Sequence, residues 1–161
     1  MMAAYTLMHV LISLVGIVAG FIVVFGLFGS KRLNGWTALF LATTVATSVT
    51  GFGFPVAHLM PSHIIGIISL VVLTIAILAR YTFRLAGAWR WVYVVGAVLA
   101  FYLNFFVLIV QLFRKVPALE ALAPTQTEPP FVVAQVAALV MFIVLGVAGV
   151  IRFHPEAKAG S

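Results

Sequence analysis

The sequence contains no cysteine and no aspartate, and its only acidic residues are Glu120, Glu128 and Glu156. The lack of cysteine excludes disulfides and thiolate metal sites, and it leaves the cellular compartment undetermined. Charged residues make up only 7% of the 161 residues, against about 25% in soluble domains, whereas 65% are apolar. A protein surface of this composition requires lipid.

The scarcity of carboxylates also argues against several functional classes. All three glutamates fall outside the apolar segments, whereas intramembrane carboxylates or arginines usually mark the ion pathways of transporters and channels. A hydrolase needs an acid beside a serine or histidine, and the apolar segments offer none. The net charge of +6 is confined to a few short loops, which argues against nucleic acid as a partner. A non-catalytic protein is therefore expected.

Five long apolar segments make up most of the chain, and each can span a membrane as a helix of about 20 residues. The second is the least apolar because of its threonines and serine, but hydroxyls can bond back to the helix backbone. We predict an all-α, polytopic membrane protein with one bundle over residues 1–154 and a short polar tail over 155–161. The five transmembrane helices are expected at residues 5–28, 36–57, 62–80, 90–113 and 131–151.

Basic residues predict how this bundle is oriented, because loops rich in lysine and arginine stay in the cytoplasm. Seven of them gather at three places on one side of the predicted bundle: Lys31, Arg32, Arg80, Arg84, Arg90, Arg152 and Lys158. The N-terminus is therefore expected outside and the C-terminus in the cytoplasm of a multi-pass cell (inner) membrane protein. Arg114 and Lys115 deviate from this pattern, but Glu120 and Glu128 balance them in the following loop.

The polar residues inside the helices recur at helical spacing. Four small or polar residues of the first helix share one face because they lie at i, i+4, i+7 and i+11. These residues are His9, Ser13, Gly16 and Gly20. When depths are compared at about 1.5 Å per residue, five side chains are predicted to converge on a polar ligand pocket in the outer half. They are His9, His63, Asn104, Gln111 and Gln135.

Histidine is the main candidate for a metal or haem ligand in this chain. Haem b takes one or two axial imidazoles, and His9 with His63 would supply both from inward helix faces at similar depth. Arg114 and Lys115 would then meet the anionic propionates. This pattern predicts a b-type haem as one alternative.

A copper site is a second alternative, because soft thioethers and imidazoles select Cu(I). Its ligands would come from Met8, His9, His58, Met60 and His63. A purely structural interpretation stands beside both alternatives. In it, His63 caps the third helix, His58 lies in water, and His9 bonds to an amide of a neighbouring helix such as Asn104 or Gln135.

An aromatic cluster in the fourth helix offers a further alternative, a flat hydrophobic ligand such as a quinone. The cluster consists of Phe101, Tyr102, Phe105 and Phe106. Asn104 or His9 would bond the quinone carbonyl. Such a cluster more often fills a core or faces lipid.

A short first helix led by His9, a small basic loop at Lys31 and Arg32, and a glycine-bearing second helix resemble small, uncharacterised bacterial inner-membrane proteins. The resemblance covers the hydropathy pattern and the first two helices, and it implies no active-site residue. We predict a non-catalytic membrane subunit or a ligand-binding module with a polar pocket in its outer half. The alternative is a redox protein that binds b-type haem or copper through outer-side histidines. The expected partners are the lipid bilayer and either a homo-oligomer or a larger membrane complex.

Overall fold

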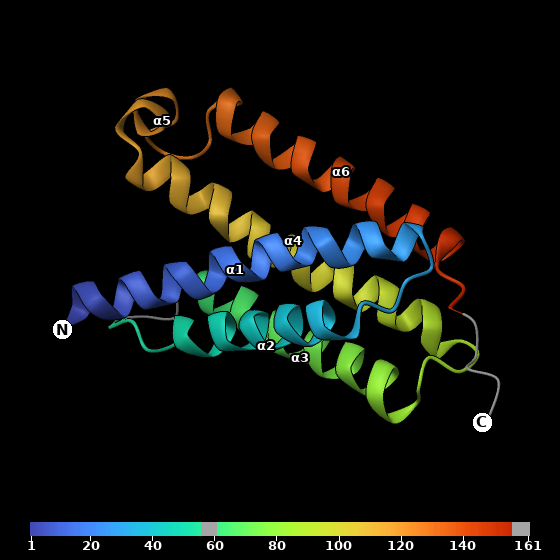
Figure 1. Cartoon of the computed structure of the whole chain (residues 1–161). Helices are drawn as coiled ribbons and strands as arrows, with labels where there is room; N and C mark the ends of the chain where they lie inside the picture. Colours follow the sequence, from blue (N-terminus) through green and yellow to red (C-terminus); the bar gives the residue numbers. More distant parts are fainter. Residues whose placement is uncertain (56–60, 156–161) are drawn as a thin grey trace.

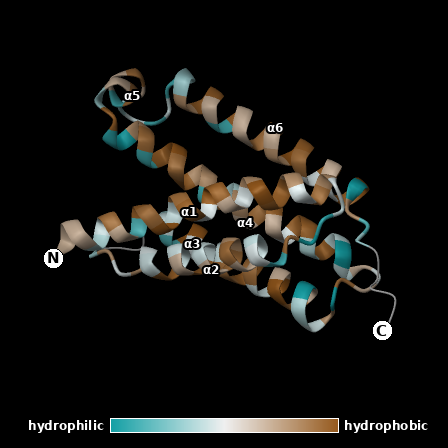
Figure 2. Ribbon diagram, in the orientation of Figure 1, coloured by the Kyte–Doolittle hydropathy of each residue, from teal (hydrophilic) through white to brown (hydrophobic). Residues whose placement is uncertain are grey.

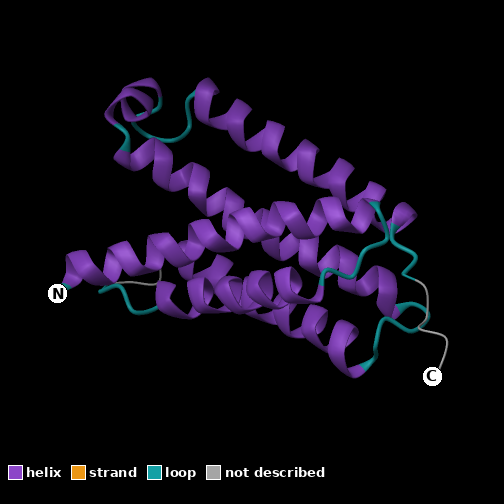
Figure 3. Ribbon diagram, in the orientation of Figure 1, coloured by secondary structure: helices purple, strands orange, loops and turns teal. Residues whose placement is uncertain are grey.

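The computed structural model describes residues 1–55 and 61–155, and within these two ranges every regular element is a helix. The elements are α1 (Met2–Phe28), α2 (Asn34–Gly51), α3 (Pro61–Ile77), η1 (Leu78–Thr82), α4 (Trp89–Lys115), α5 (Pro117–Leu122) and α6 (Pro129–Arg152). The long helices lie alongside one another and are joined by short loops at the ends of the bundle (Figures 1 and 3). The expected all-α fold is therefore confirmed.

Within the described residues, four helical segments are long and apolar enough to cross a membrane, namely α1, α3 together with η1, α4 and α6. The expected second span corresponds to α2, which is shorter and more polar and is not among these four. It was predicted to reach residue 57, but it ends at Gly51. The early end is explained by Gly53 and Pro55, since a glycine and the residue before a proline both disfavour a helix.

The core of the bundle is centred on α4. This helix packs along α3 and α6 and also contacts α1 and α2. Its Phe101 is fully buried, with ring centroids 4.9 Å from Phe21 of α1, 5.9 Å from Phe40 of α2 and 4.8 Å from Phe142 of α6. One ring therefore joins four helices. In contrast, only 17% of the apolar stretch of α6 is buried, so this helix lies at the edge of the bundle.

The predicted small and polar face of α1 does point into the bundle. Gly16 and Gly20 are both buried. A Cβ atom at Gly20 would lie 2.9 Å from the ring of Phe101, and one at Gly16 would lie 3.0 Å from the hydroxyl of Thr43. These two glycines thus allow α1 to approach its neighbours closely, as small residues do in membrane bundles.

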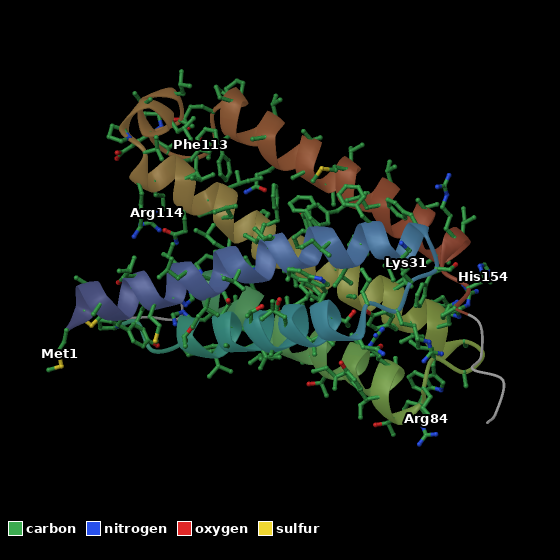
Figure 4. All side chains as sticks on the ribbon, viewed as in Figure 1. Met1, Lys31, Arg84, Phe113, Arg114 and His154 are labelled. Atoms are coloured by element: carbon green, nitrogen blue, oxygen red, sulfur yellow. The ribbon has the colours of Figure 1, made fainter. Side chains whose placement is uncertain are left out.

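The most hydrophilic residues gather at the two ends of the bundle, and the middle is largely hydrophobic except along the paler α2 (Figure 2). Lys31, Arg84 and His154 lie at one end, opposite Met1 and Arg114 (Figure 4). We call the end that holds Met1 and Arg114 the N-terminal end. We call the opposite end the basic end, because it holds Lys31, Arg32, Arg80, Arg84, Arg90 and Arg152.

The start of α4 and the loop after α1 fix the end of α6 at the basic end. Arg90 donates from one nitrogen to the carbonyls of Val150 and Phe153, at 3.1 and 2.5 Å. The hydroxyl of Ser30 donates to the carbonyl of Arg152 at 2.7 Å. These bonds satisfy carbonyls that the last turn of a helix leaves without partners.

Candidate functional site

The imidazole of His9 lies between α1 and α2, near the N-terminal end. Its Nδ1 is 2.7 Å from the hydroxyl of Thr50, and its ring packs edge-on against Phe54 with centroids 5.1 Å apart. The hydroxyl of Tyr5 donates to the carbonyl of Thr50 at 2.6 Å. His9 is therefore bonded to a threonine of α2, and its expected bond to an amide of a later helix was wrong.

Asn104 faces α1 near the middle of α4. The hydroxyl of Ser13 donates to its Oδ1 at 2.9 Å, and the side chain is 8% exposed. Its Nδ2 is buried and has no hydrogen-bond partner among the described residues. A buried unsatisfied polar group costs about 1–3 kcal/mol. Asn104 thus holds unused hydrogen-bonding capacity inside the bundle.

His63 belongs to a different helix contact. It lies in the first turn of α3, is 8% exposed, and its ring centroid is 5.5 Å from that of Phe52. The hydroxyl of Ser48 donates to that of Ser69 at 3.1 Å and also joins α2 to α3. His63 is therefore part of the α2–α3 contact, whereas His9 is part of the α1–α2 contact.

The two glutamines of the predicted pocket lie in different surroundings. Gln135 of α6 donates to the carbonyl of Phe106 on α4 at 3.3 Å, and its Oε1 is buried without a partner in the described ranges. Gln111 is exposed. The five predicted pocket residues are thus distributed over several helix contacts, and a shared polar pocket stays a prediction.

Metal or haem binding finds no support in the described residues. Within 1–55 and 61–155, no three or more histidine, aspartate or glutamate side chains are placed to hold a metal ion. His58 and Met60, predicted as ligands, lie outside the described residues. The Nδ1 of His9 already bonds to Thr50, and His63 packs in a separate contact.

Arg114 and Lys115 were predicted to meet an anionic group. They are the last two residues of α4 and lie at the N-terminal end of the bundle. Arg114 lines a polar pocket of about 340 Å³ with Glu120 and Gln126, between the end of α4 and the loop after α5. Gln126 donates to the carbonyl of Val110 at 2.9 Å and so ties this loop to α4. Lys115 is exposed and does not line the pocket. The role of either residue toward an anion stays a prediction.

Glu128 organises the loop that leads into α6. Its carboxylate accepts hydrogen bonds from the backbone and hydroxyl of Thr125 at 3.1 and 2.8 Å, and from the backbone of Thr127 at 3.1 Å. Desolvation alone would raise the pKa of Glu128, but these hydrogen bonds outweigh it, so the pKa is lowered. The negative charge precedes α6, where the helix dipole also favours it.

Arg80 at the basic end is the polar residue that sequence reasoning missed. It was predicted as the last residue of the third helix and as one of the basic residues that orient the bundle, and it lies in η1, only 7% exposed. It donates to the carbonyl of Arg32 at 2.7 Å and to Oδ1 of Asn34 at 2.8 Å, and its guanidinium lies 5.1 Å from the ring centroid of Tyr93. An arginine at a helix end is equally compatible with an exposed position, so the sequence held no signal for its burial. Arg80 fixes the loop between α1 and α2.

An apolar groove of about 430 Å³ runs between α4 and α6. It is lined from Val95 to Tyr102 on α4 and from Leu139 to Ile151 on α6. Tyr102 contributes the only hydroxyl among these lining residues, and the aromatic ring of Phe142 forms part of the wall. Several lining residues, such as Leu99 and Ile143, are exposed at the bundle surface. The groove is therefore accessible from the side of the bundle.

The groove contains one residue of the predicted aromatic cluster, Tyr102, whereas Phe101 lies in the core. Comparisons with known proteins do not assign a ligand to it. No family model, no curated protein and no solved structure matches this chain. The functional proposal therefore depends on the geometry of the described residues.

Proposed function

We propose that this chain is a five-span protein of the cell (inner) membrane and acts as a non-catalytic subunit or ligand-binding module. The ligand is an apolar molecule drawn from the bilayer into the groove between α4 and α6. The observation that carries this proposal is the accessible apolar groove of about 430 Å³. The polar residues of the outer half do not carry it, because they are distributed over separate helix contacts. Assembly into a homo-oligomer or a larger membrane complex stays a prediction.

The properties of α2 support a fifth span. Its 18 residues extend over about 27 Å, close to the roughly 30 Å of the hydrocarbon core. It carries no charged residue, and it packs against both α1 and α3. Hydroxyls such as those of Thr44, Thr47 and Thr50 donate to carbonyls four residues earlier, at 2.7 to 2.8 Å. These hydroxyls thus need no water to satisfy them.

The distribution of charge supports a cytoplasmic position for the basic end. Its six basic residues have no carboxylate beside them within the described ranges, since Glu120 and Glu128 lie at the opposite end. Short loops with an excess of lysine and arginine stay in the cytoplasm. At the N-terminal end, Arg114 and Lys115 are balanced by the two glutamates. The N-terminus is therefore proposed to lie outside.

Single cysteines test the fifth span and the orientation together, because the natural chain has none. Ser62→Cys, in the first turn of α3, is expected to react from outside with an impermeant thiol reagent. Gly35→Cys, at the start of α2, is expected to react only after the membrane is opened. Both positions are exposed, and a Cβ at Gly35 meets no atom within 4 Å. Labelling of both from one side would contradict a spanning α2, and the reversed pattern would contradict the orientation.

A photoreactive group in the middle of a lipid acyl chain tests the groove. Crosslinks mapped by peptide mass spectrometry are expected to concentrate on the lining residues of α4 and α6. Gly146→Leu is expected to reduce them, because a Cβ at Gly146 makes an ordinary contact of 3.5 Å with Val98 and the longer side chain then occupies the groove. Ala148→Leu is the matched control, since Ala148 is only partly buried and does not line the groove. Equal crosslinking of both variants would overturn the proposal.

A further inference from the structure

Polar positions of α1 and α2 face each other over two helical turns. The two helices are antiparallel and lie side by side (Figure 1). Near the N-terminal end, the Nδ1 of His9 is 2.7 Å from the hydroxyl of Thr50. Seven residues further inward along each helix, a Cβ atom at Gly16 would lie 3.0 Å from Oγ1 of Thr43. The pairing thus keeps its register over about 10 Å, and we call the surface between these two pairs the polar seam.

The inner end of the polar seam is surrounded by polar atoms. Three side-chain atoms lie nearest to the position of a Cβ at Gly16, namely Oγ1 of Thr43 at 3.0 Å, Oγ1 of Thr44 at 3.5 Å and Nδ2 of Asn104 at 3.5 Å. One turn further along α1, the three atoms nearest to the same position at Gly20 are ring carbons of Phe101. The polar surroundings are therefore a property of the space beside Gly16, where no side chain of α1 intervenes.

These three atoms offer one hydrogen-bond donor and two acceptors. The Nδ2 of Asn104 is buried and has no partner among the described residues, whereas its Oδ1 accepts a bond from Ser13. The hydroxyls of Thr43 and Thr44 each donate to a carbonyl four residues earlier in α2, at 2.7 Å. Their oxygens therefore present lone pairs to the space beside Gly16. A complementary ligand accepts one hydrogen bond and donates two.

The charge and the size of this site define the class of ligand. The amide donor disfavours a cation, and the two oxygen lone pairs disfavour an anion, so the ligand is neutral. Asn104, Thr44 and Gly16 are all buried, and Phe101 fills the next turn, which limits the ligand to a very small molecule. Water accepts and donates the required bonds, and a buried water typically makes about three.

The polar seam leads from the N-terminal end to this site. His9, Ser13 and Thr47 lie along it and are half-buried, whereas the residues at its inner end are buried. Toward the basic end the seam is closed by Phe101, whose ring centroid is 5.9 Å from that of Phe40. Water therefore enters along the seam from the N-terminal end and stops at Asn104.

We propose that one water molecule binds at the inner end of the polar seam, where it accepts a hydrogen bond from Nδ2 of Asn104 and donates to Oγ1 of Thr43 and of Thr44. The water joins α2 to α4 and satisfies the buried amide. The site is separate from the groove between α4 and α6, so this inference does not rest on the ligand proposed for that groove.

Infrared spectroscopy of the full chain in lipid bilayers tests the bound water. Exchange into water labelled with heavy oxygen is expected to shift an O–H stretching band of a sheltered water in the natural chain. Thr44→Val is expected to lose this band, because valine has the shape of threonine without the oxygen. Thr74→Val is the matched control, since Thr74 also donates to a carbonyl four residues earlier, at 2.8 Å, but is exposed on α3. An unchanged band in Thr44→Val, or no such band in the natural chain, would overturn the proposal.

A pair of substitutions at Gly16 tests the same site through stability. Gly16→Ala and Gly16→Ser add the same Cβ atom, 3.0 Å from Oγ1 of Thr43. Alanine excludes the water without replacing its hydrogen bonds, whereas the serine hydroxyl takes its place. The equilibrium constant of folding in detergent is therefore expected to be about fivefold larger for the serine variant. A serine variant no more stable than the alanine variant would contradict a hydrogen-bonded ligand beside Gly16.

Discussion

Phe101→Ala is expected to reduce the free energy of unfolding in detergent by about 3 kcal/mol. Phenylalanine-to-alanine changes in cores cost about 3–5 kcal/mol, through lost transfer energy and the remaining cavity. The transfer part is small here because lipid tails are as apolar as the core, so lost packing dominates. Phe101 is fully buried and touches aromatic rings of α1, α2 and α6, which cannot all close the cavity at once.

The control for this change is Phe25→Ala on α1. Phe25 is 61% exposed, so its removal leaves no cavity and is expected to change stability little. Reversible unfolding in a mixed-detergent titration measures both variants. Equal losses for Phe25→Ala and Phe101→Ala would contradict the placement of Phe101 at the junction of four helices.

Gly20→Leu is expected to be the second most damaging change, with a cost in the upper half of the 1–3 kcal/mol typical of overpacking. Even a Cβ atom at Gly20 would lie 2.9 Å from the ring of Phe101, which is held on all sides. The leucine therefore forces α1 away from α4. Val18→Leu is the matched control, because Val18 lies on the same helix and is 58% exposed. Equal stability of the two variants would mean that this face of α1 does not contact α4.

The double variant that combines Gly20→Leu with Phe101→Ala tests the contact between these two positions more directly than either single variant. In Gly20→Leu/Phe101→Ala, the new leucine enters the space that the ring has left. The total loss is therefore expected to be smaller than the sum of the single losses, with a coupling energy within the range of about 0.5–3 kcal/mol seen for residues in contact. Strictly additive losses would indicate that the two positions do not touch.

The helices were predictable because apolar runs long enough to span a membrane have few other stable structures. The ends of the helices were less predictable. For example, α2 ends at Gly51, although the apolar sequence continues beyond that residue. The inward face of α1 was also predictable, because Gly16 and Gly20 interrupt the apolar run at helical spacing. The burial of Arg80 depends on Asn34 and Tyr93 in other helices, a relation that helical periodicity does not contain.

The partners of the candidate polar residues depended on packing order, which depth alone does not determine. His9 and Thr50 lie near the same end because α1 and α2 run in opposite directions, yet Thr50 was not among the predicted pocket residues. Depth does not, however, show that α1 presents His9 to α2 and Ser13 to α4. The groove depends on the spacing of α4 and α6 along their whole contact. Neither helix carries a motif that marks it.

The amount of apolar ligand bound per chain in native membrane tests the proposed groove most directly. Membrane patches held in a polymer belt preserve native lipids without detergent, and mass spectrometry of the released protein counts the retained molecules. We expect one apolar molecule on the natural chain and on Ala148→Leu, and none on Gly146→Leu, whose side chain occupies the groove. Equal retention by the natural chain and Gly146→Leu, or no retained molecule at all, would contradict a ligand site between α4 and α6.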